Sequence, residues 1–334
     1  MTKKQYQVLG IGNAIVDILA KVEEDFITAH DLTKGSMMLI DAERALYLSG
    51  QIKDQEIRSG GSAGNTIAGL ADLGASTAFF GKVADDDMGQ QYYDDMAKLD
   101  VHFPTKTIKA QEPTARSIIA ITPDGERTMN TYLGACTEIG PEDMDDAVIR
   151  ASEIVYFEGY LWDPPRAKDA LRRASEIAHE AGGKVALTLS DAFCVDRYRS
   201  EFKGLIQNRT VDIVLANEDE LLSLFETNNF DNALRMLASE CTTAAITRGD
   251  KGAILLDHGE QISCKPFPVG DVVDTTGAGD MFAAGYLYGL THTMSYEDAG
   301  RLGCLLASQV IQVIGPRLDS NLRDIAAKAG FELS

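Results

Sequence analysis

Near the C-terminal end of the chain, two glycines and a carboxylate occur together in the sequence Asp-Thr-Thr-Gly-Ala-Gly-Asp at residues 274–280. An apolar run that is typical of a buried helix begins directly afterwards, at Met281. A glycine turn that opens onto a helix leaves N–H groups unpaired, and such groups bind anions, phosphate above all. Asp280 would repel that anion. Both features are explained if Asp280 accepts the proton of a hydroxyl group while the turn holds the phosphoryl group that this hydroxyl attacks.

An acidic residue in the first turn of a helix has a second explanation, because it also complements the positive end of the helix dipole. For a lone Gly-x-Gly-Asp sequence, that structural explanation would be the better one. The choice therefore depends on whether the rest of the chain supplies partners for phosphoryl transfer, and three further clusters are candidates.

The first cluster is a glycine-rich segment in which Gly60, Gly61 and Gly64 are followed at once by Asn65. The glycines let the backbone approach a ligand closely, and the Asn65 amide can both donate to and accept from a hydroxyl group. Glycine-rich loops also occur where a helix packs tightly on a sheet, so a structural role stays open. We expect a loop here that leads into a helix over 67–73.

The second cluster, from Asn217 to Glu220, comes directly after an apolar strand-like run. These two residues would share one face of an opening helix. Their oxygen atoms suit a Mg²⁺ ion that carries nucleotide phosphates, although Asn followed three residues later by Glu is equally typical of a capping box. The third cluster, Thr247 with Gly249 and Gly252, offers a hydroxyl group and two flexible backbone points for a nucleotide.

The start of the chain has Gly10 and Gly12 at the end of a short apolar strand, and Asp17 follows within an apolar stretch. A dinucleotide fingerprint would need a third glycine where Ile15 stands, which disfavours a nicotinamide dehydrogenase. No P-loop sequence occurs either, so ATP chemistry would need another phosphate cradle. Asp17 is then either a surface residue or a carboxylate directed at ligand hydroxyl groups.

Strand-like and helix-like segments alternate along most of the chain, from a strand over 7–12 through helices such as 86–98 and 165–181. This order predicts an α/β fold of three layers (α/β/α), with a mostly parallel central sheet between helices. Ligands bind at the carboxyl ends of the strands in such sheets. We therefore expect the following candidates on one rim: Asp17, Gly60, Asn65, Asn217, Thr247 and Asp280.

Two segments, about 18–41 and 112–134, consist of short apolar pieces separated by polar turns. The Pro-Asp-Gly sequence at residues 123–125 is typical of a hairpin. Neither segment fits the alternating pattern of the main sheet. We predict that the two pair as a small β-strand lid, inserted into a single domain over 1–334.

The 334 residues carry a net charge of −20, with a pI of about 4.6. Such a surface repels nucleic acids and anionic membranes, so neither is expected as a partner. The five cysteines are far apart and odd in number, which predicts free thiols in a reducing compartment. The N-terminus lacks the apolar core of a signal peptide, and no apolar run approaches the ~20 residues of a membrane span. We therefore expect a cytoplasmic protein.

Taken together, these clusters resemble the signatures of the ribokinase-like (PfkB) carbohydrate kinase family. Residues 60–65 are similar to its N-terminal signature, and residues 217–220 to its Asn-x-x-Glu motif. Residues 274–280 match its C-terminal signature, Asp-Thr-x-Gly-Ala-Gly-Asp, without a departure. The likeness covers essentially the whole chain, and it implies the ribokinase-like form of the three-layer fold.

Within that family the chain is most similar to the adenosine kinase group, in residues 10–18, 125–127, 130–136 and 187–193. This likeness implies ATP-dependent phosphorylation of a nucleoside 5′-hydroxyl, with adenosine to AMP (purine salvage) as the favoured reaction. The alternative acceptors are a free sugar such as ribose and another nucleoside, inosine or guanosine. A sugar- or nucleotide-binding regulator without catalysis is a further alternative, which the intact Asp280 argues against. The partners would be these small molecules, in a monomer or a homodimer.

The resemblance also implies individual roles. Asp280 would deprotonate the ribose 5′-hydroxyl, and Arg127 would reach the ATP phosphates. The anion hole is implied for Gly277, Ala278 and Gly279. Contacts to the nucleoside are implied for Asp17, Asn13, Gly60, Gly61 and Asn65, and contacts to ATP for Thr247, Gly249, Gly252, Asn217 and Thr276. Mg²⁺ would be organised through water by Asn217 and Glu220, and a monovalent cation, usually K⁺, by Asp274, Thr276 and Gly315.

Three aromatic residues are candidates to stack on a purine base, namely Tyr160, Trp162 and Phe193. Each has the alternative of being a core residue. The sequence does not decide which of them would meet the base.

Overall fold

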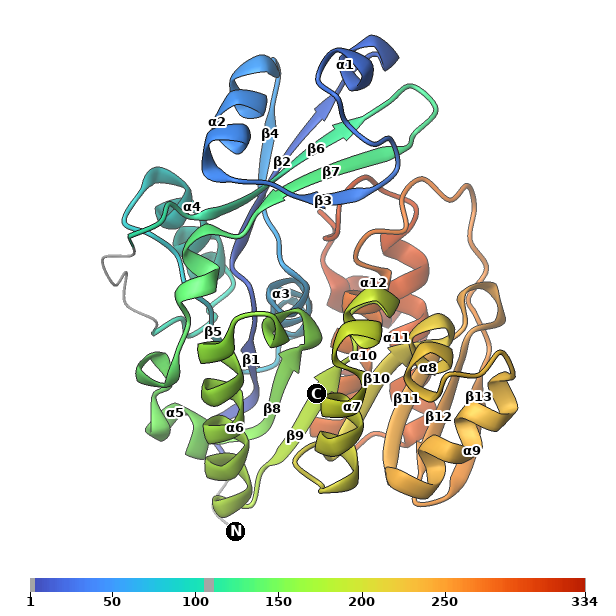
Figure 1. The fold of residues 1–334 in the computed structure, drawn as a ribbon. Coiled ribbons are helices and arrows are strands. Elements are labelled where there is room, and N and C mark those ends of the chain that lie inside the picture. Colours follow the sequence, from blue (N-terminus) through green and yellow to red (C-terminus); the bar gives the residue numbers. More distant parts are fainter. Residues whose placement is uncertain (1–3, 105–110, 334) are drawn as a thin grey trace.

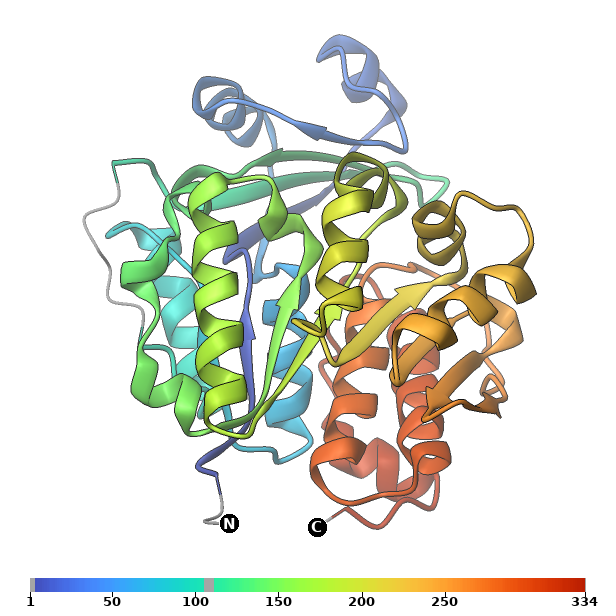
Figure 2. The same cartoon turned by 60° about the horizontal axis from the view of Figure 1, so that its bottom comes forward.

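Two sheets organise the chain, of which the computed structural model describes residues 4–104 and 111–333. Figures 1 and 2 show it from two directions, with the smaller sheet above the main sheet in Figure 1 and both termini at the bottom of Figure 2. The expectation that the N-terminus lacks the apolar core of a signal peptide rests partly on residues 1–3, which lie outside the described residues.

The main sheet has the strand order β13-β12-β11-β10-β9-β8-β1-β5. The strands from β11 to β5 run parallel, and β12 with β13 adds an antiparallel hairpin at one edge. Most residues of the parallel strands are buried because helices cover both faces, which is why these strands read as apolar runs. Its strands are β1 (Tyr6–Ile11), β5 (Thr77–Phe80), β8 (Ser152–Glu158), β9 (Lys184–Thr188), β10 (Ile213–Asn217), β11 (Thr243–Thr247), β12 (Ala253–Asp257) and β13 (Glu260–Cys264).

Helices form a layer on each face of this sheet, so the predicted three-layer α/β fold is confirmed. Figure 1 shows α6 and α7 in front of the sheet and α10 and α11 behind it. The front layer is α5 (Asp146–Arg150), α6 (Pro165–Glu180), α7 (Ala192–Gln207), α8 (Glu218–Phe225) and α9 (Phe230–Glu240). The rear layer is α3 (Ser62–Asp72), α4 (Asp87–Lys98), α10 (Ala278–Thr291), α11 (Tyr296–Val310) and α12 (Leu322–Lys328). Short 3₁₀ turns are η1 (Gly134–Glu138), η2 (Pro141–Asp143), η3 (Gly159–Trp162) and η4 (Gly249–Lys251).

The smaller sheet, called the lid sheet below, has the order β3-β7-β6-β2-β4. Its strands are β2 (Ile15–Lys21), β3 (Met37–Leu39), β4 (Glu56–Ser59), β6 (Ala115–Ile121) and β7 (Arg127–Tyr132). The helix α2 (Ala42–Gln51) packs on one face through Ala45 and Leu48, which meet Ala20, Ile118 and Tyr132. The short helix α1 (Glu24–Ala29) follows β2, and Figure 1 places both helices on the far side of the lid sheet from the main domain.

Two expectations about this region were wrong in their details. Asp17 was expected to follow a strand of the main sheet, but β2 already begins at Ile15, so Asp17 lies inside the lid sheet. The glycine-rich segment is also not an extended loop. Gly61 has a φ of +84°, which lets the chain turn sharply, and α3 begins at Ser62, so Asn65 stands in the helix.

All five cysteines are buried and unpaired, as expected for free thiols. None of the helices in the described ranges combines the length and the apolar character that a membrane crossing requires.

Candidate active site

The N-terminus of α10 lies at the rim where the two sheets meet. Gly277 caps this helix with a φ of +77°, and a Cβ there would lie 2.5 Å from the backbone oxygen of Pro316. Only glycine fits such a position. The N–H groups of Gly279 and Asp280 fall in the first turn, where a helix supplies no acceptor, and a Cβ on Gly279 would meet nothing within 4 Å. These N–H groups can therefore bind an anion.

Asp280 is held by two side chains of α3. Ser62 Oγ donates to its Oδ1 at 2.7 Å, and Asn65 Nδ2 donates to its Oδ2 at 3.0 Å. Burial raises the pKa of Asp280 to about 6, although these two hydrogen bonds and the charge of Arg317 act in the opposite direction. Asp280 is thus mostly ionised at pH 7 and fixed in orientation, and it can accept a proton.

Asp17 lies on the face of the lid sheet that is opposite to α2, because it alternates with Ile18 and Ala20 along β2. Its side chain is buried, yet no hydrogen bond to it is found within the described residues. A Cβ on Gly60 would lie 2.4 Å from Asp17 Oδ2, so the carboxylate rests against the glycine backbone. Burial raises the pKa of Asp17 to about 7, against the opposing charges of Arg317 and Arg127, and Asp280 raises it further.

Arg127, from β7 of the lid sheet, reaches the Asp274–Asp280 segment. Its Nη1 lies 2.8 Å from Asp274 Oδ2 and donates to Thr276 Oγ1 at 2.7 Å. Its buried Nη2 has no partner in the described part of the chain. Asp274 also accepts the N–H groups of Thr276 at 3.0 Å and Gly315 at 2.8 Å. The arginine therefore joins the lid sheet to the main domain and keeps one donor unused.

Two residues of the site were not predicted from the sequence. Glu158, at the end of β8, accepts the N–H and the Nδ2 of Asn13 at 3.0 and 2.7 Å and the N–H of Ala63 at 2.7 Å. It thereby ties the turn between β1 and β2 to the start of α3, and burial raises its pKa to about 7. Arg317 donates from Nε to Asn65 Oδ1 at 2.9 Å. Neither residue belongs to a recognisable motif; only the position of Glu158 at the end of a strand could have suggested it.

Asn217 and Glu220 form the capping box that the sequence analysis kept as an alternative. Asn217 Oδ1 accepts the N–H of Glu220 at 2.8 Å, and the Glu220 carboxylate accepts the N–H and Nδ2 of Asn217 at 3.0 and 2.6 Å. Asn217 is exposed, whereas Glu220 is buried and has a pKa raised to about 7 by burial. A metal would thus meet these residues through water more readily than directly. The described residues contain no group of three or more His, Cys, Asp or Glu that could hold a metal ion.

The other predicted positions are spread along the same rim. Thr247 ends β11 beside Asn217 of β10. Gly249 has open space around it, but Gly252 has a structural reason to be glycine, because a Cβ there would lie 2.1 Å from the Cys264 backbone oxygen. Both glycines have a positive φ, so they shape the turn that follows β11.

The three aromatic candidates differ in their surroundings. Trp162 lies in the core, stacked on Phe157, and its Nε1 donates to Glu201 at 2.9 Å, so it is not available to a base. Tyr160 is partly buried against Ser190, to whose backbone oxygen its hydroxyl donates at 3.3 Å. Phe193, in the first turn of α7, is 77% exposed and remains able to stack on a ligand.

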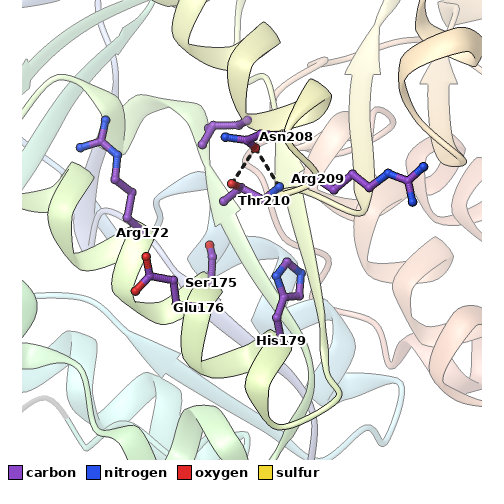
Figure 3. A pocket seen from close by; sticks show the side chains of 8 residues that line it. Arg172, Ser175, Glu176, His179, Asn208, Arg209 and Thr210 are labelled. Carbon is purple, nitrogen blue, oxygen red and sulfur yellow. Dashed lines mark hydrogen bonds between the residues drawn. The ribbon is translucent and has the colours of Figure 1, made fainter.

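A groove of about 300 Å³ lies elsewhere, between α6 and α7 (Figure 3). Its residues His179 and Asn208 stand at the C-terminal ends of these helices, and therefore near the amino ends of the parallel strands. Several of its polar groups are engaged: His179 with Asp212 at 2.8 Å, and Asn208 with Thr210. This groove contains a carboxylate, Glu176, but no helix N-terminus that could bind a phosphoryl group beside it, so it is not the site of the chemistry.

The fold and this rim define a phosphotransferase with an alcohol group as acceptor. Residues 31–322 match the model of the pfkB family carbohydrate kinases, and the chain belongs to that family. Its relatives include the aminoimidazole riboside kinase of Salmonella typhimurium, 32% identical over 72% of this chain and 76% of that protein. The adenosine kinase of Saccharomyces cerevisiae is 25% identical over 93% of this chain and 96% of that protein.

Solved structures agree with this assignment. The adenosine kinase of Sinorhizobium meliloti is 51% identical, with a TM-score of 0.91 over 98% of this chain and 100% of that chain. A probable sugar kinase from Rhizobium etli CFN 42 is 49% identical, with a TM-score of 0.92 over 98% of this chain and 99% of that chain. The protein is therefore a sugar or nucleoside kinase of ribokinase-like fold, and its family implies ATP as the phosphoryl donor.

Proposed function

We propose that the protein phosphorylates the 5′-hydroxyl of a nucleoside, with adenosine as the preferred acceptor and AMP as the product. The observation that carries this proposal is the carboxylate of Asp280, held by Ser62 and Asn65 at the N-terminus of α10. The similarity to the Sinorhizobium meliloti adenosine kinase supports the choice of acceptor. So does the similarity to a riboside kinase.

In the proposed reaction, Asp280 takes the proton from the 5′-hydroxyl as that oxygen forms a bond to the γ-phosphorus. The bond between this phosphorus and the oxygen that bridges the β- and γ-phosphates of ATP breaks in the same step, and ADP leaves with that oxygen. The N–H groups of Gly277, Ala278 and Gly279, together with that of Asp280, would stabilise the charge on the transferring group. The N–H of Ala278 would contribute less, because it also donates to the backbone oxygen of Thr275 at 3.2 Å. The unused Nη2 of Arg127 is a suitable donor to the phosphates of ATP.

The acceptor would lie between the lid sheet and α3. No described residue donates a hydrogen bond to Asp17, so its carboxylate would accept hydrogen bonds from ribose hydroxyls. Asn65 and the backbone at Gly60 and Gly61 would contact the same hydroxyls. Asn13 would contribute less, because its Nδ2 already donates to Glu158. We assign base stacking to Phe193 rather than Tyr160, on account of its exposure.

The nucleotide would lie along Thr247, Gly249 and Gly252. Mg²⁺, which is typical of such kinases, would be carried by the phosphates, with Asn217 and Glu220 contacting its water ligands. A monovalent cation such as K⁺ fits less well beside Thr276 and Gly315. Both oxygens of Asp274 already accept protein donors, and Arg127 neutralises its charge. Any K⁺ would have to share Asp274 with that arginine.

A second acceptor class, free sugars, is favoured by one observation: the probable sugar kinase from Rhizobium etli CFN 42 is 49% identical to this chain. The assay that separates the two classes measures ADP release with adenosine, inosine, guanosine and ribose at matched concentrations. We expect the highest kcat/KM with adenosine. A higher kcat/KM with ribose would assign the protein to the sugar kinases instead.

A further inference from the structure

Arg317 lies in the loop after α11 and makes a single side-chain hydrogen bond within the described residues, from Nε to Asn65 Oδ1 at 2.9 Å. Asn65 in turn donates from Nδ2 to Asp280 Oδ2 at 3.0 Å. The described residues place no carboxylate within 4.0 Å of Arg317, so it is not held in an ion pair. The three side chains form a continuous path from a guanidinium through an amide to the carboxylate that carries the proposed chemistry.

The chemistry of its two neighbours fixes the orientation of this amide. A guanidinium only donates hydrogen bonds, and an ionised carboxylate only accepts them. An amide between the two therefore has one orientation that makes both bonds, with its oxygen toward Arg317 and its nitrogen toward Asp280. Without Arg317, nothing on that side distinguishes the two ends of the Asn65 amide. Its oxygen could then turn toward Asp280, where two acceptors repel each other.

The charges around Asp280 make this cation more important. Asp17 approaches from β2 and Glu158 from β8, and both carboxyl groups are close enough to interact electrostatically with Asp280. Tyr156 also faces Asp280 from β8, but burial raises the pKa of its hydroxyl, so it adds no charge there. Arg317 is the cation that lowers the pKa of Asp280, in opposition to the effect of burial. Burial also lowers the pKa of Arg317, which reflects the free energy needed to keep this charge inside the protein.

We propose that Arg317 is a positioning residue for phosphoryl transfer, which fixes the Asn65 amide and through it the carboxylate of Asp280. This inference rests on the proposed role of Asp280 as the base. Arg317 acts through Asn65 and through its charge. Its loss should therefore change the rate of the chemical step and the pH at which the base loses its activity.

The test compares Arg317→Met, which keeps much of the side-chain length without charge or donor, with Arg317→Lys, which keeps the charge. With the best acceptor of the panel, we expect Arg317→Met to lower kcat by about 10- to 100-fold and to shift the acid limb of kcat/KM to higher pH. Arg317→Lys should return the acid limb toward that of the unaltered enzyme, while kcat stays reduced. Thermal unfolding measures any purely structural effect separately.

A double-mutant cycle with Asn65→Ala tests the path itself. Because Arg317 acts through Asn65, its substitution should lower kcat far less when Asn65 is already alanine. If Arg317→Met does not fold, the same cycle is measured with Arg317→Lys. An unchanged kcat and acid limb, or strictly additive losses in the cycle, would overturn the positioning role.

Asp280→Asn, assayed in parallel, separates this inference from the proposed function. A large loss for Asp280→Asn together with no effect of Arg317 substitutions overturns the positioning role alone. An undiminished rate for Asp280→Asn overturns both, since there would be no base to position.

Discussion

Asp17 is buried and Asp280 is half-buried, both have raised pKa values, and they approach the same site from two sides, yet their surroundings differ. Asp280, on the side of the main domain, receives hydrogen bonds from Ser62 and Asn65, the latter held by Arg317. Asp17, on the lid sheet, receives none from the described residues and rests against Gly60.

This difference separates two tasks. A group that must meet the transition state is best oriented before the substrate arrives, because no free energy is then spent on orienting it during the reaction. A group that recognises hydroxyls must instead leave its lone pairs unused until the ligand supplies donors. A buried carboxylate without donors destabilises the free protein. The contrast therefore predicts that changes on the main-domain side alter kcat, whereas changes at Asp17 alter acceptor binding and stability.

The largest effect is expected from Asp280→Asn. This change keeps the size of the side chain but removes the basic oxygen, so kcat should fall by about 10²–10⁴-fold, the usual contribution of a positioned base. The unaltered enzyme should lose kcat/KM as the pH falls below about 6, because Asp280 then becomes protonated. Kinetics across pH 5–9 and a Kd for ATP would check both points. A near-normal kcat would mean that another group accepts the proton.

Arg127→Gln should have the next largest effect, because it removes the cation that links the two sides. We expect kcat to fall by about 10²-fold, the scale of one lost donor to a transition state. The melting temperature should also fall, since Asp274 would keep its charge in a buried place without a counter-ion. Arg127→Lys is the matched control, and it should recover stability better than kcat. If kcat is unchanged while stability falls, Arg127 only joins the lid sheet to the main domain.

The same contrast shows what the sequence could reveal. The alternation of strands and helices predicted the main sheet and its two helical layers, and the motif around Asp280 predicted a carboxylate beside unpaired N–H groups. The helices α2, α5, α9, α11 and α12 were not predicted, because no chemically distinctive residues drew attention to them. The helix α1 lies within 18–41, where only short strands were expected, so that expectation was wrong for this part of the segment. The start of β2 was missed because its apolar residues continue almost directly from those of β1.

Contacts between distant parts of the chain were beyond the reach of local patterns. Glu158 ends an ordinary apolar strand, and Arg317 lies in a loop that mixes apolar residues with glycine, proline and polar residues. Their roles depend on the residues that folding brings beside them. Glu158 contacts Asn13 and Ala63, and Arg317 contacts Asn65. The type of a single residue does not show which distant residues will contact it in the folded protein. The capping box at Asn217 shows the converse, since a local spacing correctly indicated the local contact.

Asp17→Asn should have a smaller effect on the kinetics, and it should stabilise the fold where Arg127→Gln destabilises it. Asn keeps one acceptor but no charge, so KM for the acceptor should rise by about 10-fold, the scale of a hydrogen bond to a charged group, with kcat little changed. The pKa of Asp17 is raised to about 7 in the folded protein from 3.8, so its ionisation destabilises the fold above pH 7, and this penalty disappears as the pH falls toward 4.

Thermal unfolding of Asp17→Asn should therefore show a higher melting temperature than the unaltered protein at pH 8, and little difference at about pH 4. The control is Asp124→Asn on the hairpin of the lid sheet. Asp124 is exposed, and its ion pair and hydrogen bonds lower its pKa, so its loss should not stabilise the fold at pH 8. A kcat loss for Asp17→Asn as large as that for Asp280→Asn would contradict the proposal that Asp17 serves acceptor binding while Asp280 serves the chemical step.

The smallest effect is expected at Asn217, away from both carboxylates, where a structural and a chemical role can be separated. Asn217→Ala removes the cap of α8 and should lower stability by about 1 kcal/mol. Asn217→Ser keeps a capping oxygen, so it should restore the melting temperature, but its shorter side chain cannot reach the same water ligands of Mg²⁺. We therefore expect the Mg²⁺ concentration for half-maximal rate to rise a few-fold in both variants. If serine restores the Mg²⁺ dependence along with stability, the side chain serves the helix alone, and the metal is held by the nucleotide without help from this residue.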